Sequence, residues 1–70
     1  MSNLKRIRES RELTQSQLAE ASGVNLRLLQ YYEQGYKDIN KAQALTVYKI
    51  AQALESPIED LLEIKKEVEE

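Results

Sequence analysis

Four polar residues fall on one side of a predicted helix, and they are the side chains here best suited to recognising a partner. Arginine carries a rigid fork of N–H donors, and a glutamine amide offers both a donor and an acceptor. At about 100° per residue, the opposite side carries the apolar residues Leu29 and Tyr32. The members of the polar face are Arg27, Gln30, Tyr31 and Gln34. The simpler alternative is an ordinary solvated helix face without a ligand.

Catalysis is disfavoured by the residue types that the sequence lacks. It contains no histidine and no cysteine, so the commonest general base and the thiolate ligands for metals are missing. No phosphate-binding glycine loop is present either. We therefore expect a protein that is not an enzyme, with no cofactor, no metal and no small-molecule substrate.

Length and charge predict a small cytoplasmic domain with two electrostatically different parts. The 70 residues suit a single domain spanning 1–70, and no apolar stretch is long enough for a membrane span. The net charge is −2, but residues 1–48 hold seven basic and five acidic side chains. Residues 49–70 hold three basic and seven acidic ones. The first part is thus the better candidate for contact with an anionic partner.

Helix start and stop signals divide the chain into five segments. Thr14 and Gln17 match a capping box, Gly23 can end a helix in the left-handed conformation, and Pro57 suits a first helical position. The expected helices run from a Ser2 or Asn3 cap to about Glu12, from Gln15 to Ser22, from an Asn25 cap to about Glu33, over about 41–54 behind an Asn40 cap, and from Pro57 to about Lys65. Residues 64–70 would form an acidic extension of the last helix. The sequence predicts a compact all-α fold.

Residues 15–34 meet the spacing demands of a helix-turn-helix. Ala19 is a small residue where two helices must approach closely, and Gly23 follows four residues later at the turn. The apolar anchors before, within and after the turn are Leu18, Val24, Leu29 and Tyr32. Each of these residues alone is weak evidence for the motif, but their combination between two capped helices is not typical of another motif.

Three segments resemble the lambda-repressor/Cro (Xre) family of helix-turn-helix transcriptional regulators. Residues 13–20, LTQSQLAE, resemble the family's LTQEELAE segment, and residues 23–35 resemble its GVS…I…YENG segment. Residues 50–54 and 58–62 resemble its closing IAKAL…SLDELL. The resemblance covers about residues 3–63. It implies a five-helix fold in which helices 2 and 3 form the helix-turn-helix and helix 3 enters the DNA major groove.

The resemblance also implies which residues touch double-stranded DNA. Base contacts are expected from Leu26, Arg27, Gln30 and Tyr31. An arginine on guanine O6 and N7 is worth roughly 1–3 kcal/mol of discrimination, while glutamine suits adenine and leucine suits a thymine methyl. Phosphate contacts are expected from Gln15, Gln17, Gln34, Tyr36 and Lys37, with Lys41 as a further candidate. For each of these, an ordinary exposed polar residue is the alternative.

The family pattern gives Glu33 a structural role, because Arg8 occupies the place of its ion-pair partner in the first helix. Two features depart from the pattern. Leu26 and Leu28 place apolar groups on the flanks of the recognition helix, where they could bind protein instead of DNA; the alternative for Leu28 is that it packs against Tyr31 or the second helix. Residues 38–41 replace a proline-containing loop, so we expect the start of the fourth helix to differ from the family pattern.

An apolar stripe at i, i+3 and i+7 of the expected last helix suggests a homodimer. Its members are Leu61, Ile64 and Val68, and the alternative is that they extend the core or fray in solvent. A two-fold dimer would hold its recognition helices about 34–36 Å apart and select a pseudo-palindromic operator. We expect a repressor; the alternative is a protein-interaction module, such as an antitoxin-like partner or an anti-repressor target.

Overall fold

The computed structural model describes residues 2–64, which form five α-helices and one 3₁₀ turn. The elements are α1 (Asn3–Ser10), α2 (Gln15–Ser22), α3 (Leu26–Gln34), η1 (Ile39–Lys41), α4 (Ala44–Leu54) and α5 (Ile58–Leu61). The predicted all-α, five-helix fold is therefore confirmed. None of the described helices is long and apolar enough to cross a membrane.

The first three helices begin at the caps that the sequence predicts. Ser2 Oγ accepts the N–H of Lys5, and Thr14 forms a complete capping box with Gln17. Asn25 Oδ1 accepts two backbone N–H groups at the start of α3, at 2.8 and 3.3 Å. Gly23 adopts φ +75° after α2, a conformation that costs glycine little because it has no Cβ. These local signals fix where the helix-turn-helix elements start and stop.

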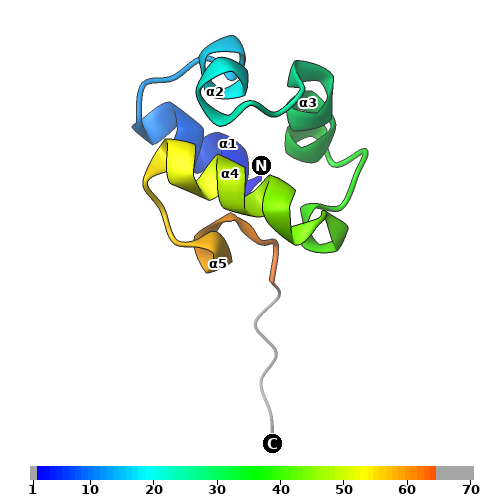
Figure 1. Cartoon of the computed structure of the whole chain (residues 1–70). Helices are drawn as coiled ribbons and strands as arrows, with labels where there is room; N and C mark the ends of the chain where they lie inside the picture. Colours follow the sequence, from blue (N-terminus) through cyan, green and yellow to red (C-terminus); the bar gives the residue numbers. More distant parts are fainter. Residues whose placement is uncertain (1, 65–70) are drawn as a thin grey trace, which may run out of the picture.

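Every helix contributes to a single apolar core. Its completely buried side chains are Leu4, Leu18, Leu29, Ile50, Leu54 and Leu61. In Figure 1, α2 and α3 lie at one end of the molecule, α5 lies at the other, and α1 and α4 lie between them. α3 packs against α1 and α2, and α4 packs against α2 and α5. This arrangement leaves the outer side of α3 open to solvent.

The fourth helix starts later than expected. Asn40 does not cap it; residues 39–41 form η1 instead, Ala42 is extended, and α4 begins at Ala44. The reason is the buried side chain of Ile39, which is only 3% exposed and draws the loop into the core. The first helix is also shorter than expected, because it ends at Ser10 and Glu12 takes a positive φ of 60°. Both predicted boundaries were wrong.

Arg11 follows α1 directly and binds the end of α4. Its Nε donates to the Leu54 carbonyl at 2.7 Å, and its Nη2 donates to the Glu55 carbonyl at 3.3 Å. The last carbonyls of a helix have no partner within it, so this side chain supplies one. Glu55 itself closes α4 in the left-handed conformation.

The predicted long last helix is wrong, because α5 ends at Leu61. Asn3 and Asn40 bind the two residues that follow it, Leu62 and Glu63, and we call this set of contacts the C-terminal clasp. Asn3 Nδ2 donates to the Leu62 carbonyl at 2.8 Å, and the backbone N–H of Asn3 donates to Glu63 Oε2 at 2.7 Å. Asn40 pairs with the Glu63 backbone, donating to its carbonyl at 2.9 Å and accepting its N–H at 2.8 Å. Because Leu62 is extended, the helix stops at Leu61.

The predicted dimer stripe does not form on α5. Leu61 is fully buried in the core, Ile64 lies beyond the helix with 65% of its surface exposed, and Val68 lies outside the described residues. The i, i+3, i+7 spacing has meaning only along a continuous helix, which the clasp prevents. Of the predicted acidic extension over 64–70, residue 64 is not helical, and the remainder also lies outside the described residues.

We expect Asn40→Ala to lower the free energy of unfolding by about 1–2 kcal/mol, because it removes two hydrogen bonds to the Glu63 backbone. Urea denaturation, monitored by circular dichroism, measures the change in the free energy of unfolding. Gln52→Ala, at an exposed position of α4, is the control and should leave the midpoint unchanged. Equal stability of the Asn40 variant and the wild type would show that the Asn40 contacts of the clasp contribute nothing.

Candidate nucleic-acid interface

The turn between α2 and α3 brings the two helices together around buried side chains. The N–H of Gly23 donates to the Ala19 carbonyl at 2.9 Å, and the N–H of Val24 donates to Ser22 Oγ at 3.2 Å. Val24 is buried, and Leu18 and Leu29 are completely buried on either side of the turn. The apolar side of α3 is thus held against the core, so its polar side must face outward.

The four predicted base-contact residues differ in how far they reach the surface. Leu26 and Arg27 are exposed in the first turn of α3, whereas Gln30 and Tyr31 are half-buried. The ring of Tyr31 meets the ring of Tyr36 edge to face, with centroids 5.9 Å apart. Of these four, Arg27 is therefore the one exposed side chain that can form hydrogen bonds. Contact of any of the four with DNA stays a prediction.

Three predicted phosphate-contact residues lie at the end of α3 and in the loop that follows it. Gln34, Tyr36 and Lys37 are all exposed, Tyr36 with 75% of its surface. The loop turns back tightly, because the backbone N–H groups of Tyr36 and Lys37 both donate to the Tyr31 carbonyl, at 2.9 and 3.3 Å. The backbone of Tyr36 and Lys37 is consequently held close to the polar side of α3.

The two predicted phosphate-contact residues of α2 are already engaged within the protein. Gln17 Oε1 accepts the backbone N–H of Thr14 at 2.8 Å, as the capping box requires. Gln15 Nε2 donates to Glu33 Oε1 at 2.9 Å. Each amide keeps at least one N–H that these bonds do not use, since a side-chain NH₂ carries two. Both remain able to donate to an anion outside the protein.

The Arg8–Glu33 ion pair predicted from the family pattern is present and ties α1 to α3. Arg8 Nε donates to Glu33 Oε2 at 2.7 Å, and Arg8 Nη2 donates to Glu33 Oε1 at 3.0 Å. The exposed fractions of the two side chains are only 9% and 3%. Arg8 Nη1 also donates to the Leu13 carbonyl at 2.7 Å. Hydrogen bonding to Glu33 raises the pKa of the Arg8 guanidinium, which keeps this buried side chain positively charged.

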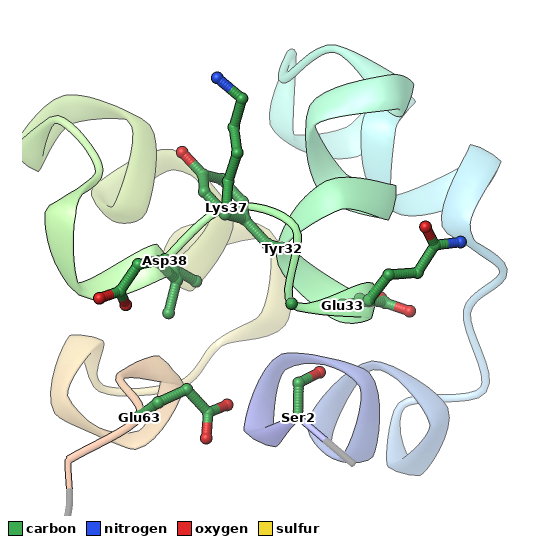
Figure 2. A pocket seen from close by; sticks show the side chains of 9 residues that line it. Ser2, Tyr32, Glu33, Lys37, Asp38 and Glu63 are labelled. Carbon is green, nitrogen blue, oxygen red and sulfur yellow. The ribbon is translucent and has the colours of Figure 1, made fainter.

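A hollow lies at the C-terminal end of α3. Figure 2 shows it between the start of α1, the end of α3 and the following loop, with Ser2 and Glu63 on one side. The amine of Lys37 points away from both of these residues. Residues 2–64 contain no group of three or more side chains placed to hold a metal ion.

Leu28 does not belong to an exposed apolar flank, contrary to one interpretation of the sequence. It is half-buried and packs against the core, so Leu26, which is 37% exposed, is the one accessible leucine of that predicted pair. Sequence reasoning also missed the roles of Arg11, Asn3 and Asn40. No local signal marks them, because their partners lie far away along the chain.

Glu33→Ala should lower the free energy of unfolding by about 3–5 kcal/mol, because it leaves the buried Arg8 guanidinium without its counter-charge. Replacing both charges, as in Arg8→Met with Glu33→Leu, should cost less than Glu33→Ala alone, since no charge is then stranded. Denaturant titration of both variants makes the comparison. A double variant less stable than the single one would contradict this interpretation.

Stability should also fall in alkali because of Tyr32. Burial raises the pKa of the Tyr32 phenol, since the charged phenolate is poorly solvated there. An unfolded tyrosine ionises at about pH 10. The contribution of the Tyr32 phenol to the free energy of unfolding is therefore complete below that pH, and it is lost as the pH rises toward the higher pKa of the folded protein. Between about pH 9 and about pH 11, the urea midpoint of Tyr32→Phe should change less with pH than that of the wild type. Tyr48→Phe, which changes an exposed ring, should keep the wild-type pH dependence; the same behaviour in both variants would contradict the assignment.

Comparison with known proteins agrees with this geometry. A protein-family model described as helix-turn-helix matches residues 4–61, which include α1 to α5 almost completely. A search of curated proteins finds no significant match to the chain.

Proposed function

Because this chain belongs to the lambda-repressor/Cro family of helix-turn-helix DNA-binding regulators, we propose that it is a transcriptional repressor that binds a pseudo-palindromic operator as a homodimer. The observation that carries the proposal is the division of α3 into two sides. Leu29 and Tyr32 are buried against the core, while Arg27 is free on the opposite side. A helix presented in this way fits the DNA major groove.

Base recognition is assigned to the outer side of α3. Arg27 donates two hydrogen bonds to O6 and N7 of a guanine, and the exposed Leu26 covers a thymine methyl. Tyr31 borders the same surface and contributes its hydroxyl. Affinity comes mainly from the phosphates, which Gln34 contacts from the end of α3, and Lys37 and the Tyr36 hydroxyl from the loop after it.

Dimerisation explains how so short a recognition helix selects a long site. Two copies related by a two-fold axis would place their α3 helices in successive major grooves, about 34–36 Å apart. Repression then needs only occupancy of a promoter. Leu61 of the predicted stripe is enclosed in the core, so the proposal does not assign it to the dimer surface.

A protein-binding function is the second candidate, favoured by the net charge of −2 and by the exposed Leu26. Salt separates the two. DNA binding weakens steeply as salt rises, because neutralised phosphates release their counterions. An apolar protein contact does not weaken in this way.

Selection of binding sites from a random duplex pool tests the proposal. The wild type should enrich a two-fold symmetric motif, and Arg27→Ala should lose preference at one base position in each half-site, a loss of roughly 1–3 kcal/mol of discrimination. No enrichment by the wild type at low salt would contradict DNA recognition. An asymmetric motif would contradict the homodimer.

Lys37→Gln should weaken binding to all duplexes alike and make the slope of log K against log salt less steep by about 0.9, the change expected for one lost phosphate contact. Fluorescence anisotropy at several salt concentrations measures the slope. Lys49→Gln, on the exposed surface of α4, is the matched control and should keep the wild-type slope. Equal slopes for all three proteins would remove Lys37 from the interface.

A further inference from the structure

Two glutamine side chains extend the hydrogen-bond network of the buried Arg8–Glu33 ion pair. Gln15 Nε2 donates to Glu33 Oε1 at 2.9 Å, and Gln30 Nε2 lies 3.5 Å from Gln15 Oε1. Gln15 and Gln30 are both half-buried, and they belong to α2 and α3 respectively. The side chain of Gln30 therefore reaches across the helix junction toward α2.

The charge of Glu33 fixes which way both amides face. A carboxylate only accepts hydrogen bonds, so Gln15 must turn its NH₂ group toward Glu33 and its oxygen away. That oxygen can only accept, so Gln30 must turn its own NH₂ group toward Gln15. The direction of each amide follows from the buried charge, and an amide turned the other way would bring two acceptors together.

We infer that Gln30 is a positioning residue that holds the Gln15 amide for a DNA phosphate, and that it does not read a base. This inference rests on the proposed function and differs from the sequence prediction for Gln30. An adenine reader needs its amide donor and its oxygen free in the groove. Gln30 instead turns its amide NH₂ toward Gln15 of α2, with 3.5 Å between Nε2 and Gln15 Oε1, so one of its two N–H groups is directed away from the groove. Gln15, held from two sides by Glu33 and Gln30, has one remaining N–H to donate outward.

The test compares Gln30→Met, which keeps the length of the side chain but removes the amide, with Gln15→Ala. Gln30→Met should weaken binding by about 3- to 10-fold, the range for one modest hydrogen bond, and equally for every duplex. Its selected motif should match that of the wild type at all positions. Adding Gln30→Met to Gln15→Ala should cause almost no further loss, because the group that it positions is already absent.

Gln17 provides the matched control, since its side-chain amide bonds Thr14 and not Gln30. The effects of Gln17→Ala and Gln30→Met should therefore add. In the free protein, Gln30→Met should also shift the side-chain amide resonance of Gln15 in a ¹⁵N–¹H spectrum while leaving the unfolding midpoint near the wild-type value.

Three results would overturn the assignment: loss of preference at one base position in Gln30→Met, additive losses with Gln15→Ala, or unchanged affinity. Each of them leaves DNA binding by the wild type intact. A wild type that binds no duplex at low salt would instead overturn the proposed function, and this assignment with it.

Discussion

Two opposite charges lie inside this helical core, and neither is tolerable there without the other. The Glu33 carboxylate accepts two hydrogen bonds from Arg8 and one from Gln15. Arg8 in turn donates to the Leu13 carbonyl between α1 and α2. One buried carboxylate therefore gathers donors from α1 and α2 around the last turns of α3. Because these bonds are directional, they constrain how α3 is set relative to the rest of the domain.

That constraint matters because the two sides of α3 have different tasks. The buried side, with Leu29, fixes the depth of the helix against the core, and the ion pair fixes its end. The outer side, with Arg27, is then presented on a rigid element, which the proposed recognition of base edges requires. The C-terminal clasp around Glu63 closes the opposite end of the domain, beside α5 (Figure 1).

Sequence was most informative where the physics is local. The Thr14 capping box and the left-handed Gly23 depend on neighbours within four residues, and both are present as predicted. The ion pair followed from a family pattern, not from spacing alone. Asn40 was misplaced because its partner, Glu63, is 23 residues away. The same distant contact stops α5, so the predicted stripe through Leu61 failed with it. Contacts between distant segments leave no periodic trace in the sequence.

On the proposed function, the outer side of α3 and the loop after it form a DNA interface. Titrating the ¹⁵N-labelled chain with a duplex of about two helical turns at low salt tests it directly, residue by residue. We expect the largest chemical-shift changes at Arg27, Tyr31 and Lys37, with the amides of α5 (Ile58–Leu61) almost unmoved. Changes concentrated on α4 and α5, or no changes at all, would contradict it.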